Sequence, residues 1–199
     1  MKFLRFSAFA ASFILFACQP TTPPAVIIID GDKTITLQTD ERIPSALLTQ
    51  AGITLNSDDR VLLNGLPIAP DQPITNTPIT IQIRRAFSLT LITPDGQHQL
   101  QSSAFTVGEV LQEATYWLHA RDKVEPVLNS PISDGMTITV TPSRELTLSV
   151  DGGAVRINSS AQIVGEALAE AGIPLIGLDY SLPPGNEPIP SDGQIRVVR

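Results

Sequence analysis

The sequence predicts an α+β protein in which one small unit, strand-strand-helix-strand with room for a further strand, occurs three times. Three observations predict this fold class. An Asp-Gly pair lies between two runs of alternating apolar residues at Asp30-Gly31, Asp95-Gly96 and Asp151-Gly152. A short stretch with apolar residues at helical spacing follows each pair, and a strand-like run closes each copy. The repeat is considered first, because overlooking an internal repeat leads to the wrong architecture for the whole chain.

Each copy begins with a predicted β-hairpin. The hairpins cover residues 26–39 (VIIIDGDKTITLQT), 89–102 (LTLITPDGQHQLQS) and 146–159 (LTLSVDGGAVRINS). Asp-Gly between alternating apolar residues is a strong hairpin signal, since a type I′ turn needs positive φ at both central residues. We therefore expect a type I′ turn at each of the three pairs.

A short helix follows each hairpin. Residues 44–55, 107–118 and 164–175 align without a gap and place apolar side chains on one helix face. Thr106 and Glu109 form a capping-box pattern in the second copy. Gly52 and Gly172 predict left-handed caps at the ends of the first and third helices. Thr115 occupies that position in the second copy, so we expect its helix to end differently.

Beyond the helix, each copy carries an aspartate at an equivalent position, followed by a Pro-Ile pair and a closing strand. The aspartates are Asp59, Asp122 and Asp179, and the strands are expected at residues 79–83, 137–140 and 194–198. Acid-base catalysis needs two carboxyl groups in one cleft. Because each aspartate belongs to a different unit, we expect these side chains to brace the turn after the helix. Extra residues in the first copy, 64–72 (NGLPIAPDQ), are interpreted as a surface-loop insertion.

The repeats predict three compact units in an elongated array. We place them at residues 26–85, 86–144 and 145–199. Each unit exceeds the 20 to 45 residues of a typical solenoid repeat and has its own hairpin, helix and closing strand. The junctions near Ala86 and Glu145 are a few residues long, which favours a stiff array over a flexible one.

Residues 1–17 have the pattern of a lipoprotein signal peptide. Lys2 and Arg5 precede an apolar stretch from Phe6 to Phe16, which is too short for a spanning helix. Cys18 follows and is the only cysteine of the chain, so it has no disulfide partner. We expect Cys18 to be acylated and residues 18–25 to form a Pro/Thr linker, which predicts secretion across the cytoplasmic membrane and anchoring at the cell envelope. An ordinary secretory signal with an incidental cysteine is the alternative.

Without residues 1–17 the chain has 11 basic and 20 acidic side chains, a formal charge of −9. Such a surface repels nucleic acid and anionic headgroups. We therefore expect no nucleic-acid partner, and membrane contact through the lipid on Cys18 alone.

Four motifs resemble a known family. They are DGDKTITLQT (30–39), the helix ending AGI (51–53), Asp-Arg-Val (59–61) and PISDGMTITV (131–140). Together they are similar to the ubiquitin-like module called domain of unknown function 348. The resemblance implies a β-grasp fold for each copy, so the array is three tandem ubiquitin-like β-grasp domains (β-β-α-β-β).

The same resemblance implies a location on the bacterial cell surface. In resuscitation-promoting factors a similar triple array precedes a five-glycine adhesion module and a peptidoglycan-cleaving domain. The sequence here reaches Arg199 directly after the third copy. We therefore expect the architecture and location to carry over, and not the enzymatic activity of those C-terminal domains.

Few residues have catalytic or metal-binding potential. His98 and His119 are the only histidines and are not spaced as metal ligands, so we expect no metal site, no cofactor and no enzymatic activity. Tyr116 and Trp117 take the places of Ile53-Thr54 and Ile173-Pro174 in the other copies. An exposed tryptophan there would be a platform for a sugar ring or a protein partner. The alternative is that Trp117 fills a local gap or an inter-domain seam.

The favoured hypothesis is a non-enzymatic, lipid-anchored envelope protein whose three units act as a semi-rigid spacer and adhesion or recognition array, touching peptidoglycan or a partner protein. One alternative is an accessory or truncated member of a peptidoglycan-remodelling system. Another is a soluble-ligand-binding β-grasp protein of polysaccharide export.

Overall fold

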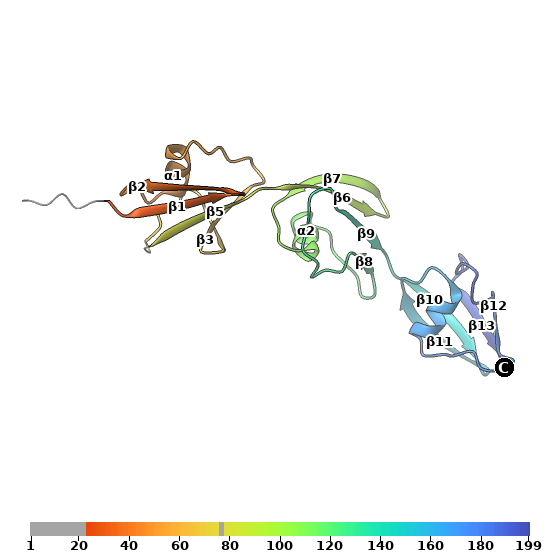
Figure 1. Cartoon of the computed structure of the whole chain (residues 1–199). Helices are drawn as coiled ribbons and strands as arrows, with labels where there is room; N and C mark the ends of the chain where they lie inside the picture. The colour runs from red at the N-terminus through yellow and green to blue at the C-terminus, as the bar shows by residue number, and fades with distance from the viewer. Residues whose placement is uncertain (1–22, 76–77) are drawn as a thin grey trace, which may run out of the picture.

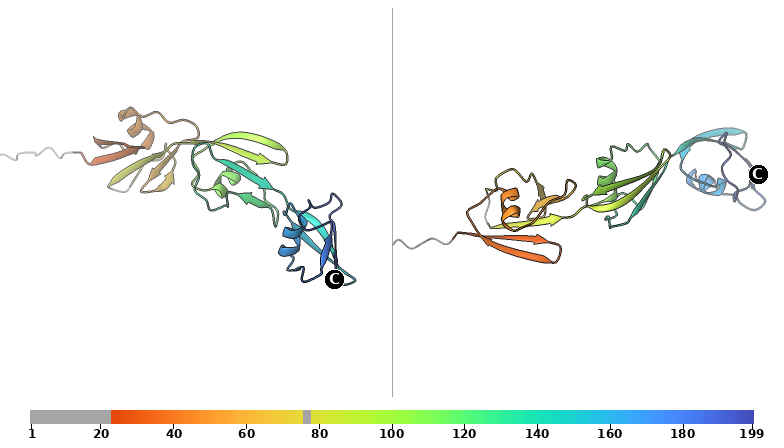
Figure 2. Two further views of the ribbon diagram at one scale, coloured as in Figure 1. Left: turned by 45° about the vertical axis from the view of Figure 1, so that its right-hand side comes forward. Right: turned by 90° about the horizontal axis from the view of Figure 1, so that it is seen from above.

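The computed structural model describes residues 23–75 and 78–199, and in this part of the chain three sheets follow one another in an extended row (Figure 1). Each sheet carries one short helix, and the two further views show the same row without folding back (Figure 2). The signal peptide expected at residues 1–17 and the lipid site expected at Cys18 lie outside the described residues.

The first unit, module 1, is a five-stranded mixed sheet in the order β2-β1-β5-β3-β4 with one helix. Its elements are β1 (Ala25–Asp30), β2 (Lys33–Gln38), α1 (Pro44–Gln50), β3 (Arg60–Leu63), β4 (Leu66–Ile68) and β5 (Ile79–Arg84). The first strand, β1, pairs antiparallel with β2 and parallel with the last strand, β5. A parallel pair needs a crossover connection, and the segment that contains α1 provides it.

Modules 2 and 3 repeat this topology with four strands, in the orders β7-β6-β9-β8 and β11-β10-β13-β12. Module 2 consists of β6 (Phe87–Thr93), β7 (Gly96–Ser102), α2 (Val107–Glu113), β8 (Lys123–Glu125) and β9 (Thr137–Thr141). Module 3 consists of β10 (Arg144–Val150), β11 (Gly153–Ser159), α3 (Val164–Glu170), β12 (Tyr180–Leu182) and β13 (Gln194–Val198). The parallel pairs β6-β9 and β10-β13 complete three tandem β-grasp domains, which confirms the predicted fold class.

Each module has its own core between the helix and one face of the sheet. The apolar helix positions expected from the sequence are buried, with Leu47, Val110 and Ala167 each 0% exposed. They pack against alternating residues of the two central strands, such as Ile28 and Ile81 in module 1. The cores form three separate clusters, so each module buries its apolar residues independently of its neighbours.

The hairpin turns differ from one module to the next. In module 3 the central residues are Asp151-Gly152, with φ of 51° and 80°, as a type I′ turn requires. In module 1 the pairing places Gly31-Asp32 at the centre, and only the glycine has positive φ. In module 2 the centre is Pro94-Asp95, and the proline ring holds φ negative. The type I′ prediction is therefore wrong for modules 1 and 2.

The insertion in module 1 is a hairpin and not a surface loop. Residues Asn64-Gly65, with φ of 52° and 85°, connect β3 to β4, which extends the sheet by one strand. Asn-Gly between two apolar runs is a type I′ signal as strong as Asp-Gly. The residues that follow the Asn-Gly pair therefore form the additional edge strand.

The three helices end in the same way. Gly52 and Gly172 adopt φ of 71° and 69°, which confirms the predicted left-handed caps. Thr115 adopts φ of 54° at the equivalent position, and its N–H donates to Gln112 O at 3.0 Å as in the other two ends. The expectation of a different end is wrong, because Tyr116 must turn back onto the core of module 2.

Candidate functional site

The repeated aspartates of modules 1 and 2 connect the turn after the helix to the linker that leads to the next module. Asp59 accepts hydrogen bonds from Asn56 N–H and Ala86 N–H, both at 2.9 Å. Asp122 accepts them from His119 N–H at 2.8 Å and from Ser143 N–H at 2.7 Å. Each carboxylate therefore fixes the direction in which the chain leaves its module.

An arginine completes this arrangement in modules 1 and 3. Arg85 contacts Asp59 at 2.7 Å and Asp30 in the hairpin turn at 2.5 Å. Arg199 contacts Asp179 at 2.8 Å and Asp151 at 3.1 Å in the same way. The repeated aspartates thus bond to groups of their own modules and, for Asp59 and Asp122, to the linker that follows, and the structure does not gather them into a cleft for acid-base chemistry.

Two of these carboxyl groups have lowered pKa values. Burial alone would raise the pKa of Asp59, whose side chain is 1% exposed, but hydrogen bonds from Asn56, Ala86 and Arg85 lower it by more. At Asp122 burial likewise opposes hydrogen bonds from Ser143 and His119, and the pKa is again lowered. Both groups are therefore held ionised.

Arg84, the last residue of β5, braces module 1 against module 2. Its guanidinium donates to Ser103 O at 2.7 Å and to Ala104 O at 2.6 Å. The same group lies over the ring of Phe105, 4.4 Å from the ring centre. Burial lowers the pKa of the Arg84 guanidinium. An arginine nevertheless stays protonated in a protein at neutral pH, so the bonds of Arg84 are charge-assisted.

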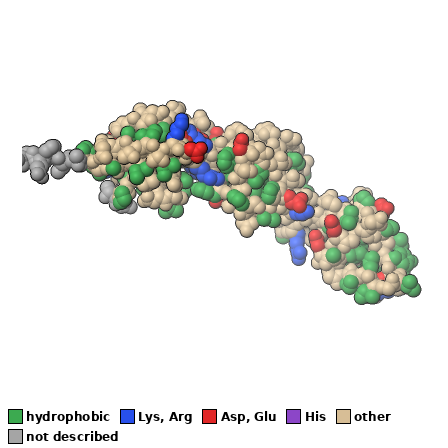
Figure 3. Space-filling model, viewed as in Figure 1, with side chains coloured by type: hydrophobic (Ala, Val, Ile, Leu, Met, Phe, Trp, Pro, Cys, Tyr) green, Lys and Arg blue, Asp and Glu red, His purple; other side chains and the backbone are tan. Residues whose placement is uncertain are grey.

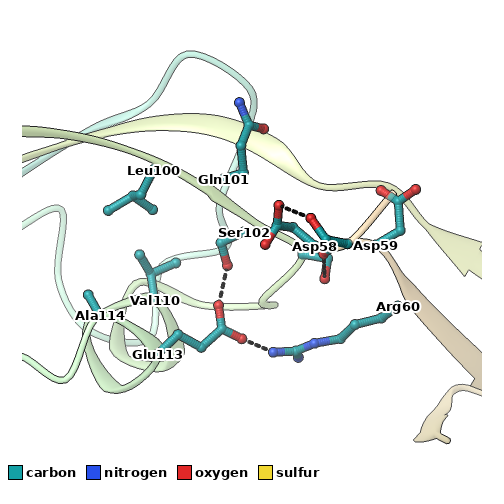
Figure 4. Close-up of a pocket in the computed structure, with 11 residues that line it drawn as sticks. Asp58, Asp59, Arg60, Leu100, Gln101, Ser102, Val110, Glu113 and Ala114 are labelled. Atoms are coloured by element: carbon teal, nitrogen blue, oxygen red, sulfur yellow. Dashed lines mark hydrogen bonds and ion pairs between the residues drawn. The ribbon is translucent and has the colours of Figure 1, made fainter. Parts of the chain in front are cut away.

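A cleft of about 410 Å³ lies at this junction (Figure 4). Arg60 of module 1 pairs there with Glu113 of α2, which also accepts a hydrogen bond from Ser102 at 2.5 Å. Ser103 donates to Asp58 O at 2.6 Å across the junction. Arg60 and Glu113 pair with each other across the cleft, and Ser103 bonds to Asp58 O, so the cleft acts first as an interface between two modules.

The second junction lacks this bracing. Lys123 and Thr141 occupy the positions equivalent to Arg60 and Arg84, and Lys123 pairs with Glu125 of its own module at 2.9 Å. Ser159 and Glu170 repeat the Ser102-Glu113 bond at 2.6 Å. Over residues 23–75 and 78–199, none of the hydrogen bonds or ion pairs joins module 2 to module 3. The linker residues Pro142-Ser143 are the covalent connection between these two modules.

Trp117 is exposed on module 2. Its exposed fraction is 83%, so it fills neither a gap nor an inter-domain seam, whereas Tyr116 turns inward against the core. An apolar groove of about 200 Å³ lies beside it, lined by Gly108, Leu111, Gln112, Thr115, Tyr116, Trp117, Leu118 and Leu128. Burial raises the pKa of Tyr116, which keeps its hydroxyl neutral.

The two histidines lie on the surface of module 2. His98 and His119 are exposed, and His119 lies 3.6 Å from the carboxylate of Asp122. Among the residues that the structure describes, there is no group of three or more His, Cys, Asp or Glu side chains placed to hold a metal ion. In the same part of the chain, no helix has the length and apolar character needed to cross a membrane.

Comparison with protein families gives three matches to one domain, the G5-linked ubiquitin-like domain known as domain of unknown function 348, at residues 26–63, 92–129 and 146–180. The chain belongs to this family. It is a tandem array of a cell-surface type of domain, and such ubiquitin-like domains are generally non-catalytic. Asp59, Asp122, Asp179, Tyr116 and Trp117 lie within the G5-linked ubiquitin-like matches.

Arg84 lies outside the matched residues of this G5-linked ubiquitin-like array. The sequence analysis also missed it, because no other copy has an arginine at that position. Arg60 and Glu113 were missed for a related reason, since only the folded structure brings the end of one module against the helix of the next. The only indication of this contact in the sequence was a basic residue, Arg84, at the end of the closing strand of module 1.

Proposed function

We propose that this protein is a non-enzymatic, lipid-anchored envelope protein whose G5-linked ubiquitin-like domains form a semi-rigid spacer with a recognition surface. The observation that carries the proposal is the bracing of modules 1 and 2 by Arg84, which reaches two backbone carbonyls of the next module. A flexible tether would not require such contacts between its modules. A spacer needs them, because its reach depends on a fixed direction between its parts.

The two junctions predict different stiffness. Hydrogen bonds from a charged donor contribute about 1.5–3 kcal/mol each, and a cation over a ring adds about 0.5–2 kcal/mol. Modules 1 and 2 are therefore held by several kcal/mol beyond the linker, while modules 2 and 3 depend on Pro142-Ser143 and on Lys123 facing Glu166 and Glu170 at longer range. The array is then a stiff pair followed by a module with greater freedom to bend.

Trp117 is the recognition contact in this proposal. An aromatic ring with a polar edge that is exposed beside an apolar groove is suited to stacking on a sugar ring or anchoring a protein partner. Peptidoglycan is the first ligand to test, because the family resemblance points to the cell wall. The lipid on Cys18 would hold the array at the membrane, with module 3 farthest from it.

The experiment that tests the spacer is a distance measurement by electron spin resonance on residues 19–199, which contain all the helices and strands described above. Spin labels are placed on exposed positions of the three modules, as Asp40→Cys, Gln97→Cys and Ala154→Cys. We expect a narrow distance distribution between modules 1 and 2 and a broader one between modules 2 and 3.

The Arg84→Ala variant, alone and with Arg60→Ala, should broaden the first distribution and leave the second unchanged. Arg156→Ala is the matched control, since Arg156 is 74% exposed and pairs with Glu145 inside module 3 at 3.8 Å. Equally broad distributions for both junctions in the unmodified protein would refute the semi-rigid spacer.

A further inference from the structure

A second cleft of about 410 Å³ lies between modules 2 and 3. Lys123, Glu125 and Thr141 line it from module 2, and Glu166 and Glu170 are among the residues that line it from module 3. Figure 3 shows acidic and basic side chains close together where these two modules meet. In the part of the chain that the structure describes, no ion pair joins the two sides of this cleft.

The first junction shows how such a cleft is closed. Ser102 donates to Glu113 Oε2 at 2.5 Å within module 2, and Arg60 of module 1 pairs with the other oxygen, Glu113 Oε1. The same guanidinium lies 3.7 Å from Glu109. One carboxylate of the helix is therefore held by its own module on one side and by the preceding module on the other.

The second junction has the same parts, but they are not joined. Ser159 donates to Glu170 Oε2 at 2.6 Å, and no hydrogen bond to Glu170 Oε1 occurs among the described residues. Lys123 occupies the position of Arg60, and its ammonium bonds to Glu125 of its own strand at 2.9 Å. The acceptor in module 3 and the cation in module 2 are both available for a contact like that of the first junction.

Glu125 is the difference that keeps them apart. It lies two residues from Lys123 on β8, so both side chains project from the same face of the strand. The equivalent residue of module 1 is Leu62, which leaves the arginine of the first junction without a carboxylate beside it. Glu125 raises the pKa of Lys123 by its hydrogen bond and its charge, and Glu166 and Glu170 add to this at longer range.

The competing pair is weak, and the linker permits a contact across the junction. The side chains of Lys123 and Glu125 are 56% and 61% exposed, and exposed ion pairs contribute little. At both junctions two residues connect the closing strand to the next module, and an aspartate of the turn bonds to the second of them. The first junction therefore shows that a linker of this length, held in this way, lets the cation reach the next helix.

We propose that the second junction is a hinge with an ionic latch, and that Glu125 holds this latch open. In the open state Lys123 pairs with Glu125, and the linker alone connects the two modules. In the closed state Lys123 pairs with Glu170 Oε1 and faces Glu166, in the arrangement of the first junction. The inference rests on the proposed spacer and names the side chain that lets the spacer bend.

The test measures the distance between spin labels at Gln97→Cys in module 2 and Ala154→Cys in module 3. Glu125→Gln removes the competing charge and keeps the size of the side chain. It should narrow the distance distribution to a width between those of the unmodified second and first junctions, because Thr141 provides no counterpart of Arg84. The narrowing should be lost in about 1 M NaCl, where the screening length falls to about 3 Å.

Adding Lys123→Gln or Glu170→Gln to Glu125→Gln should restore the broad distribution. Glu145→Gln is the matched control, since Glu145 is an exposed carboxylate of module 3 that pairs with Arg156 of the same module. A distribution that Glu125→Gln leaves as broad as before, or that stays narrow when Lys123 is also replaced, would overturn the latch. The distribution between modules 1 and 2 in the same proteins tests the spacer separately, because Glu125→Gln does not touch the first junction.

Discussion

Thr115→Gly should stabilise module 2. Thr115 has a φ of 54° at the helix end, in the left-handed region that a β-branched residue rarely adopts. The equivalent residues of the other modules are Gly52 and Gly172, which adopt similar φ values without a Cβ. Glycine at position 115 should therefore release the backbone strain while the helix end keeps its geometry.

The expected gain follows from two opposing terms. A left-handed residue with a Cβ costs about 1–2 kcal/mol. The greater freedom of glycine in the unfolded chain offsets about 0.4–1 kcal/mol of that gain. The Thr115 hydroxyl bonds to Ala114 O at 2.8 Å on the exposed surface, so its loss changes little. The net gain is about 0.5–1 kcal/mol, or roughly 3–6 °C in the melting temperature of a domain of this size.

Hydrogen exchange measured by mass spectrometry resolves the modules separately, through the amides of β6 and β9 for module 2 and of β10 and β13 for module 3. The reciprocal variant Gly172→Thr is the control, because a Cβ at Gly172 would meet nothing within 4 Å and only the φ of 69° opposes it. It should lower the stability of module 3 by a similar amount. Unchanged or faster exchange of the module 2 amides in Thr115→Gly, or unchanged or slower exchange of the module 3 amides in Gly172→Thr, would refute the reasoning.

Three further predictions concern the carboxylates, the tryptophan and the anchor. The pKa values of Asp59 and Asp122 lie below the ordinary 3.8 in the folded state, so their stabilisation is complete above that pH and is lost as the pH falls through the folded values. Melting temperatures should therefore drop in acid, and Asp59→Asn with Asp122→Asn should lower stability at neutral pH and flatten the acid limb. Trp117→Ala should reduce binding to purified peptidoglycan in a pull-down. The free energy of unfolding should change by less than about 0.5 kcal/mol, since the side chain is 83% exposed. Cys18→Ala should abolish incorporation of a labelled fatty acid and release the protein from the membrane fraction; an unchanged membrane fraction would contradict lipid anchoring.

The fold of each module could be predicted from the sequence, because the patterns for its hairpin, helix and closing strand are local and occur three times. Helix positions such as Leu47, Val110 and Ala167 are fully buried as the spacing predicts. The errors are also local. Pro94 excludes a type I′ turn in the second hairpin, and the Asn64-Gly65 signal was interpreted as part of a loop although it satisfies the rule used for Asp-Gly.

The junctions could not be predicted, because their partners are distant in the sequence and differ between copies. In the sequence, Arg84 is an ordinary residue at the end of a closing strand. Its hydrogen bonds to Ser103 O and Ala104 O are seen only in the folded structure. Thr141 takes its place at the second junction, so comparison of the repeats hides the contact. Trp117 was found by that same comparison, because there the difference between copies is itself the signal.

The turn after the helix has the same backbone hydrogen bond in each module but carries different side chains. In module 1 the turn at Asp58 to Arg60 meets the next module through polar contacts, and in module 3 the equivalent turn presents Leu178 and Tyr180 to solvent. The backbone of the turn is fixed by the aspartate in each copy, so its side chains can change without disturbing the module. One structural position can therefore carry polar junction contacts in one copy and exposed apolar side chains in another without a change in its backbone.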